Sequence, residues 1–308
     1  MSGRRRGQPA EKQAETARPQ GLRALRTANE VREAVAAWRA RGESVGLVPT
    51  MGAFHEGHLS LVRSAREACE RVIVSIFVNP AQFGPDEDYE VYPRDEARDR
   101  RELEAVGVDV VFAPEVAEMY PPGFATSVRV RGLTEGLCGA FRPHHFEGVT
   151  TVVTKLLVQV LPDAAYFGEK DYQQLQVIRR LARDLDLPVR IEAVATVREA
   201  DGLALSSRNV YLSAAERRIA PRLYQTLKSL AERLAGAARV DAETIAREVE
   251  IAEERLLAAG FARIDYLEVR DAETLEPASS LDRPARALAA AWLGSTHLID
   301  NYPVPPVA

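Results

Sequence analysis

Short apolar runs alternate with longer amphipathic segments along roughly the first 195 residues. The apolar runs are predicted as strands over 44–49, 71–78, 108–113, 164–167 and 189–194. The segments between them are predicted as helices over 58–70, 94–106, 149–160 and 172–185. Nearly continuous apolar strands separated by helices are typical of a parallel sheet that is covered on both faces. The pattern therefore predicts a doubly wound, Rossmann-like α/β domain over 21–195.

The remaining third of the chain has a different order of elements. Two Ala/Glu/Arg-rich amphipathic helices are expected over 214–236 and 241–260, and three strands follow near 264–270, 286–293 and 296–300. Helices followed by strands indicate an α+β unit. We therefore expect a smaller C-terminal lid domain over 196–308, with the boundary within 196–209. Residues 1–20 contain almost no large apolar side chains, so we expect a disordered tail there, with no signal peptide.

Composition narrows the class of protein. The chain has 308 residues, of which 45 are acidic and 40 are basic, and this mild acidic excess argues against a nucleic-acid binder. No apolar stretch approaches the roughly 20 residues that a membrane helix needs. Cys69 and Cys138 lie far apart without a metal-ligand spacing, which suggests two small core residues in a reduced, cytoplasmic protein. Only four of the basic residues are lysines, so a lysine in an unusual place is informative.

The loop between the first predicted strand and helix carries two histidines, His55 and His58. Ligands of parallel sheets bind at the carboxyl ends of strands, and a helix N-terminus favours phosphate. Two imidazoles there can hydrogen-bond a polyphosphate and stabilise charge during its transfer. A metal site built on these two histidines would need a third ligand, which the local sequence does not supply. Either histidine could instead simply cap the helix. The local sequence therefore favours phosphate binding without excluding the cap.

Polar residues also follow the next strand and precede a later helix. Asn79 and Gln82 are amides suited to a small substrate with hydroxyl and carboxylate groups, although Asn-Pro is also a common turn. His145 is a candidate substrate contact or a loop histidine without a role, whereas we expect the adjacent His144 at the surface. Lys155, on an apolar helix, either lies at the surface or reaches the cleft.

Two further segments carry groups that suit a nucleotide. Gly168 and Lys170 end the fourth strand, where a glycine permits close approach and a lysine can bind phosphate. Asp171 can bind a ribose hydroxyl or Mg²⁺, and Gln174 lies one helical turn further on. The run 206–208, Ser-Ser-Arg, is a possible phosphate clamp, although the same string alone is more typical of a linker.

Taken in order, the segments PTMGAFHEGH, FVNPAQF, YPR, HFEGV, FGEKDYQQ and LSSRN closely resemble the pantothenate synthetase (pantoate–β-alanine ligase) family of the HIGH-motif nucleotidyltransferase superfamily. The resemblance covers about residues 22–302. It implies a ligase of pantothenate biosynthesis with the substrates ATP, (R)-pantoate and β-alanine. Pantoate would be adenylated by Mg·ATP with release of pyrophosphate, and β-alanine would then displace AMP. A cytoplasmic homodimer is also implied, with no nucleic acid and no membrane partner.

The resemblance assigns roles to individual residues. His58 takes the position of the proton donor, Gln82 and Gln174 match substrate contacts, and Asp99 falls near a magnesium-linked position. The implied ATP-binding residues are Met51, Gly52, Ala53, Phe54, His55, Glu56, Gly57, His58, Gly168, Glu169, Lys170, Asp171, Val197, Leu205, Ser206, Ser207 and Arg208. Asn79 and His145 complete the expected substrate site. Leu205 replaces a common Met, and His297 replaces a common Arg in a C-terminal strand that we expect outside the site.

Two other functions compete with this interpretation. A plain adenylyltransferase would release the adenylylated product instead of passing the acyl group to an amine. A nucleotide-binding regulatory module would need no turnover, although a sensor would not need groups that stabilise a transition state, such as the two histidines and Lys170.

Overall fold

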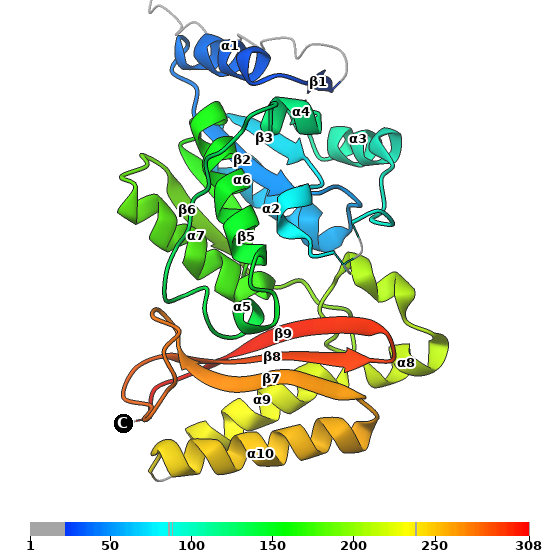
Figure 1. Cartoon of the computed structure of the whole chain (residues 1–308), viewed down its shortest axis with the longest axis vertical. Coiled ribbons are helices and arrows are strands. Elements are labelled where there is room, and N and C mark those ends of the chain that lie inside the picture. The colour runs from blue at the N-terminus through cyan, green and yellow to red at the C-terminus, as the bar shows by residue number, and fades with distance from the viewer. Residues whose placement is uncertain (1–21, 86, 88, 238, 308) are drawn as a thin grey trace, which may run out of the picture.

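Two separate sheets organise the computed structural model, which describes residues 22–85, 87, 89–237 and 239–307. A parallel sheet with its helices forms one end of the molecule, and a smaller antiparallel sheet with two long helices forms the other (Figure 1). This arrangement confirms the predicted fold class. The tail expected at 1–20 lies outside the described residues.

The parallel sheet has six strands in the order β1-β4-β3-β2-β5-β6. Their bounds are β1 Arg23–Leu25, β2 Val45–Thr50, β3 Arg71–Ile76, β4 Val110–Phe112, β5 Ala164–Gly168 and β6 Arg190–Val194. The chain leaves the central β2 toward β3 and β4, and later returns to the other side of β2 with β5 and β6. The order therefore reverses between β2 and β5, which is where open parallel sheets form a ligand crevice.

Alternate residues of the strands enter two different cores. In β3, Ile73 packs in one core while Val72 and Val74 pack in the other, as the twofold alternation of a strand requires. The first face is covered by α1 Ala28–Arg39, α6 His145–Val160 and α7 Tyr172–Asp184, and the second by α2 Glu56–Ala68 and α3 Glu96–Ala105. Burial on both faces explains why the sequence of these strands is almost uniformly apolar.

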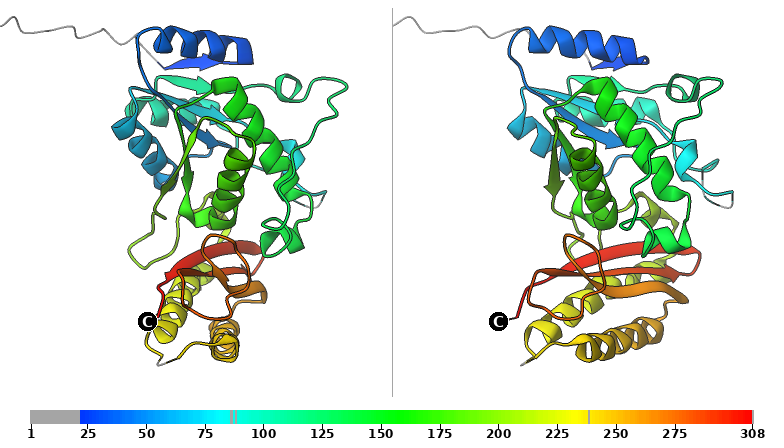
Figure 2. Two further views of the ribbon diagram at one scale, coloured as in Figure 1. Left: turned by 90° about the vertical axis from the view of Figure 1, so that its left-hand side faces the viewer. Right: turned by 60° about the vertical axis from the view of Figure 1, so that its left-hand side comes forward.

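The antiparallel sheet contains β7 Arg263–Asp271, β8 Ala285–Leu293 and β9 Thr296–Val304 in that order. One face packs on α9 Arg222–Ala235 and α10 Ala242–Ala259, through residues such as Ala289 and Leu298. The opposite face turns toward the parallel-sheet unit and adds Tyr266 and Leu288 to its core. Figure 2 shows this sheet lying between the two long helices and the rest of the chain.

The remaining elements are short. They are the helices α4 Val116–Met119, α5 Cys138–Phe141 and α8 Ala214–Ile219, and the 3₁₀ turns η1 Pro80–Gln82, η2 Glu169–Asp171 and η3 Ser207–Tyr211. In the described part of the chain, no helix is both long and apolar enough to cross a membrane.

The structure corrects two predicted boundaries. The helix expected over 214–236 is two helices, because Pro221 has no N–H to continue the hydrogen-bond ladder and becomes the N-cap of α9. The strand expected to end at Asp300 continues to Val304 as β9, since an edge strand tolerates Pro303. No strand or helix was predicted before residue 44, although Thr27 and Glu30 form a capping box that marks the start of α1.

Candidate active site

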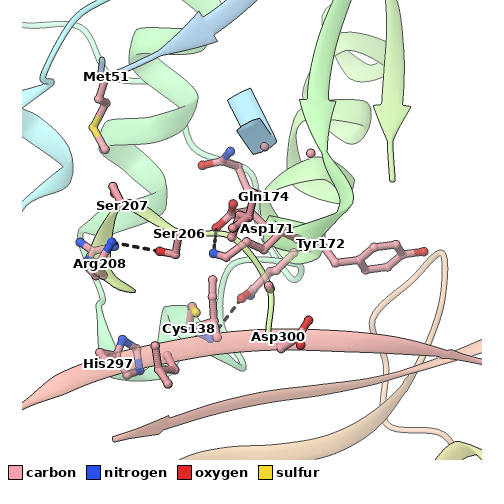
Figure 3. Close-up of a pocket in the computed structure, with 18 of the residues that line it drawn as sticks. Met51, Cys138, Asp171, Tyr172, Gln174, Ser206, Ser207, Arg208, His297 and Asp300 are labelled. Atoms are coloured by element: carbon pink, nitrogen blue, oxygen red, sulfur yellow. Dashed lines mark hydrogen bonds and ion pairs between the residues drawn. The ribbon is translucent and has the colours of Figure 1, made fainter. Parts of the chain in front are cut away.

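The carboxyl ends of β2 and β5 open into a cavity of about 710 Å³ at the point where the strand order reverses. The loop after β2 brings His55 and His58 to this cavity, and η2 brings Lys170 from the end of β5. The antiparallel sheet closes the opposite side of the cavity. In Figure 3, β9 carries His297 and Asp300 and runs below the remaining labelled residues. Segments more than 100 residues apart therefore line one space.

The loop after β2 has an unusual backbone that a buried carboxylate holds in place. Gly52 has φ +82° and Ala53 has φ +54°, so both lie in the left-handed region. Asp99 of α3 is only 2% exposed, and its carboxylate accepts hydrogen bonds from Ala53 N at 3.1 Å and Phe54 N at 3.3 Å. A Cβ at Gly52 would lie 2.6 Å from Asp99 Oδ2. The loop conformation thus requires a glycine and an acceptor at these two positions.

The first histidine both caps α2 and faces the cavity. His55 is the N-cap, and its Nδ1 accepts a hydrogen bond from Gly57 N at 3.1 Å. Burial, together with the positive charge of Lys170, lowers the pKa of His55 below its ordinary value. A neutral imidazole whose Nδ1 is an acceptor carries its proton on Nε2. His55 can therefore cap the helix and donate a hydrogen bond to a ligand at the same time.

His58 lies against His55, with ring centroids 4.1 Å apart. Burial lowers the pKa of His58 to about 3, and the charges of His55 and Lys170 act in the same direction. Its Nδ1 is buried and has no hydrogen-bond partner among the described residues. An unpaired buried nitrogen costs stability, so a hydrogen-bonding ligand in the cavity would remove this cost.

Lys170 supplies a cation to the same space. Its only ion-pair partner in the described chain is Asp171, at 4.0 Å from Nζ to Oδ1. The lysine side chain is largely buried, and its charge is close enough to lower the pKa of both His55 and His58. A cation that is only loosely paired beside two neutral imidazoles forms a site that suits an anion.

A second group of side chains surrounds Gln82 at the end of β3. Asn79 is buried, and its Nδ2 donates to Gln82 Oε1 and to Gly148 O, both at 3.1 Å. His145 Nδ1 lies 3.0 Å from the backbone oxygen of Gln82, so it donates its proton there and leaves Nε2 as an acceptor. Burial lowers the pKa of His145 to about 4 and keeps the ring neutral near pH 7.

The approach of α6 to η1 depends on a missing side chain. A Cβ at Gly148 would lie 2.2 Å from Ala81 O, so any larger residue would push the helix away from Gln82. Gln174 of α7 also lines the cavity, and its amide has no hydrogen-bond partner in the described chain. The Gln174 amide is therefore available to a ligand beside Gln82.

Residues 206–208 approach from the other side of the cavity and form the start of η3. Ser206 caps this turn by accepting a hydrogen bond from Arg208 N at 3.3 Å. Figure 3 shows Ser206, Ser207 and Arg208 facing Asp171 and Gln174 across the open space. Two hydroxyls and a guanidinium thus line the wall opposite η2.

Most of the predicted site residues line this one cavity. They are Met51, His55, Gly57, His58, Gln82, His145, Gly168, Lys170, Asp171, Gln174, Val197, Leu205, Ser206, Ser207 and Arg208. Gly52, Ala53, Phe54, Glu56, Asn79, Asp99 and Glu169 are not among its lining residues. Asn79 instead holds the lining residue Gln82, and Asp99 holds the loop that carries His55 and His58. Lys155 also lies away from the cavity, with Nζ 4.9 Å from the ring centroid of Phe124.

The contribution of the antiparallel sheet was missed. His297, which we expected outside the site, lines the cavity, and so do Trp292, Asp300 and Asn301. His297 stacks on Trp292 at 4.7 Å, and burial lowers its pKa to about 4. Cys138 packs against the core, as expected, and also lines the cavity, where its Sγ lies 3.1 Å from the Tyr266 hydroxyl. The adjacent polar pair Asp300 and Asn301, in the middle of β9, was a signal that the sequence offered.

The described residues do not form a preassembled metal cage. No group of three or more His, Cys, Asp or Glu side chains among them could hold a metal ion. Of the carboxylates in the predicted ATP segments, only Asp171 lines the cavity. Mg²⁺ keeps several waters and commonly binds through one or two carboxylates and the phosphates of a substrate. The cavity therefore fits a Mg²⁺ ion that arrives bound to a nucleotide.

Comparisons with known proteins identify the family. The family model described as pantoate-beta-alanine ligase matches residues 23–303. A pantothenate synthetase from Paramagnetospirillum magneticum is 58% identical over 283 residues, covering 92% of this chain and 98% of the relative. The crystal structure of pantothenate synthetase from Thermus thermophilus has a TM-score of 0.86 at 50% identity, covering 92% of this chain and all of the other.

A second solved structure is a pantoate-beta-alanine ligase from Francisella tularensis, described as a complex with beta-gamma ATP and beta-alanine. It has a TM-score of 0.73 and 31% identity, and the match covers 91% of this chain and 97% of that one.

Proposed function

The chain belongs to the pantoate–β-alanine ligase family, and we propose that the cavity between its two sheets holds both half-reactions of this ligase. The enzyme condenses (R)-pantoate with β-alanine at the expense of ATP and forms pantothenate, AMP and pyrophosphate. One observation carries the placement of this reaction. His55, His58 and Lys170 line the same cavity as the amides of Gln82 and Gln174, so groups suited to phosphate and groups suited to a small polar substrate share one space.

In the first half-reaction, a carboxylate oxygen of pantoate attacks the α-phosphorus of ATP and pyrophosphate leaves. Negative charge accumulates on the phosphate oxygens during this step, and fixed donors stabilise it. Lys170 supplies a cation, His55 supplies Nε2–H, and the positive end of the α2 dipole adds to the field at the phosphates. Ser206, Ser207 and Arg208 close the nucleotide site from the opposite wall.

The pKa of His58 rises when the nucleotide binds. Burial keeps His58 neutral in the free enzyme, and the nearby Lys170 charge opposes its protonation. A triphosphate in the cavity reverses the sign of the local field and raises the pKa of His58 toward its ordinary value. His58 then donates a hydrogen bond to the pentacoordinate phosphorus centre. Stabilising that centre matters more than net proton transfer.

In the second half-reaction, the amine of β-alanine attacks the acyl carbon of pantoyl adenylate and AMP leaves. The amides of Gln82 and Gln174 bind the polar groups of pantoate, and Asn79 keeps the Gln82 amide in place. His145 is neutral, with Nε2 free to accept a hydrogen bond from a substrate hydroxyl or amine. A closed cavity keeps water from the reactive adenylate.

Mg²⁺ enters as Mg·ATP and neutralises phosphate charge in this scheme. Phosphate oxygens and water supply most of its ligands, and Asp171 is the nearest candidate carboxylate in the ATP segments. We assign Asp99 to holding the loop that carries the histidines, because its oxygens accept hydrogen bonds from Ala53 and Phe54.

A simple assay tests the function as a whole. The purified chain is incubated with ATP, Mg²⁺, pantoate and β-alanine, and each substrate is omitted in turn while AMP and pantothenate are measured. We expect both products in equal amounts only when all substrates are present. Pyrophosphate release without amide formation would instead indicate a plain adenylyltransferase, and nucleotide binding without any turnover would indicate a regulatory module.

The homodimer and the cytoplasmic location follow from the family resemblance. Sedimentation equilibrium at micromolar concentration tests the first, with twice the chain mass of 33.9 kDa expected. A particle of one chain mass would refute the dimer without affecting the assignment of the active site.

A further inference from the structure

Two neighbouring residues of β9, Asp300 and Asn301, are buried beside the cavity, yet the mechanism gives them no role. Asp300 is 5% exposed and Asn301 is 3% exposed. Buried polar side chains are costly unless their hydrogen-bonding groups are paired, so their partners indicate what they do. We refer to Asp300 and Asn301 together as the β9 clasp.

Asn301 holds the backbone that carries Lys170. Its Nδ2 donates to the carbonyl oxygens of Glu169 and Lys170, both at 2.9 Å, and its Oδ1 accepts from Arg286 Nε at 2.7 Å. These partners fix the orientation of the amide, because only nitrogen can donate to carbonyls and only oxygen can accept from a guanidinium. Both amide hydrogens are donated to the backbone of η2, so Asn301 influences the cavity by holding this turn in place.

Arg286 reinforces the same contact from β8. Its Nη2 donates to Glu169 Oε2 at 3.2 Å, and its guanidinium lies 4.1 Å from the ring centroid of Tyr172. The Tyr172 hydroxyl in turn donates to Ala272 O at 2.8 Å. The segment that places Lys170 in the cavity is thus held by the antiparallel sheet as well as by β5.

Asp300 points from the opposite side of the strand, as the alternation of side chains requires. Its Oδ2 accepts from Arg198 Nη1 at 2.6 Å, and its Oδ1 accepts from Nη2 at 2.9 Å. Arg198 belongs to a short hairpin in which it pairs with Ala204, and Leu205 N donates to Val197 O at 3.0 Å. This hairpin leads directly into residues 206–208.

We propose that Asp300 and Asn301 are positioning residues that set the distance between the two phosphate-facing walls of the cavity. Asn301 holds the wall with Lys170, and Asp300 holds the hairpin that leads into Ser206–Arg208. Because the two residues are adjacent on one strand, the walls cannot move apart without breaking a buried hydrogen bond. This inference rests on the proposed nucleotide site and extends it to the antiparallel sheet.

The first test replaces Asn301, whose side-chain amide donates to the backbone of η2. Asn301→Asp keeps an oxygen for Arg286 but places the other oxygen against two carbonyls. We expect adenylation in a single turnover to slow about 10- to 100-fold and the KM for ATP to rise about 10-fold, with the pantoate KM within about twofold, as for a displaced binding group. Asn301→Leu removes the donor without adding charge and should act in the same direction. Asn29→Asp, on the exposed surface of α1, is the matched control.

The second test asks whether Asn301 acts through Lys170. In a Lys170→Ala background, Asn301→Asp should slow adenylation by less than about threefold, because coupled residues are not additive. If the full effect persists in that background, or if Asn301→Leu has the wild-type KM for ATP, the proposal is wrong. Lys170→Ala with wild-type adenylation would instead refute the assignment of Lys170 to phosphate.

Hydrogen exchange tests the clasp without reference to catalysis. Amides within 168–172 should exchange faster in Asn301→Asp and Asn301→Leu than in the wild type or Asn29→Asp, since two tertiary hydrogen bonds to this segment are lost. Asp300→Asn should raise the ATP KM without this change in exchange, because it loosens the other wall. Unchanged exchange in both Asn301 variants would overturn the proposal, whatever their activity.

Discussion

Three histidine side chains in the cavity are neutral near pH 7, where a solvent-exposed histidine would be partly protonated. His58, His145 and His297 all have pKa values below the ordinary range, to about 3, 4 and 4, and burial is the main cause in each. His58 and His145 were predicted as site residues from the sequence and His297 was not, whereas the charge states of all three depend on burial that only the folded chain provides. An active site of neutral donors around one lysine is prepared for an anionic substrate.

The lowered pKa values predict a loss of stability in acid. Because the unfolded chain binds protons on these histidines near pH 6.5 and the folded chain does so only near pH 3–4, stability is complete above about pH 6.5 and falls with pH below it. Each histidine costs about 1 kcal/mol between pH 7 and pH 5.5. Urea unfolding at both pH values should show a smaller acid loss for His58→Gln than for the wild type, with exposed His144→Gln as control. An equal loss in both variants would contradict the burial of His58.

Helices and strands bring these side chains together, and only some of these placements could be predicted from the sequence. Strands were correctly predicted where β2, β3 and β5 lie, with ends that differ by one or two residues, and their loops meet because the carboxyl ends of parallel strands share one edge. The role of α3 could not be predicted, because nothing local links Asp99 to a loop more than 40 residues earlier. That link depends on the packing of α3 against the sheet, which places the carboxylate under Ala53 and Phe54.

Asp99→Asn tests whether α3 positions the loop. An asparagine turns one acceptor into a donor that faces a backbone N–H, so we expect adenylation to slow about 10- to 100-fold through misplacement of His55 and His58. The dependence of the rate on Mg²⁺ concentration should stay unchanged. Glu104→Gln, on the exposed side of α3, is the control. Recovery of the Asp99→Asn rate at high Mg²⁺ would show that Asp99 serves the metal instead.

The two sheets together line the candidate active site, and this could be predicted only in part. The fold class and the phosphate-binding motifs follow from local patterns. The approach of the antiparallel sheet depends on contacts between distant residues, such as Asn301 with Lys170, which no local pattern encodes. His297 was therefore misplaced. The division into domains at 21–195 and 196–308 stays a prediction. Residues on both sides of the predicted boundary line the cavity, including Val197 and Arg208.

Formation of pantoyl adenylate in a single turnover tests the mechanism most directly. Enzyme in excess over ATP is mixed with Mg²⁺ and pantoate, without β-alanine, and the acyl adenylate is measured by rapid quench. His58→Ala should slow this step about 10²- to 10³-fold, the effect of losing one donor to a transition-state anion, while His144→Ala should form the adenylate at the wild-type rate. Adenylate formation by His58→Ala within a few-fold of the wild type would contradict the proposed role of the cavity.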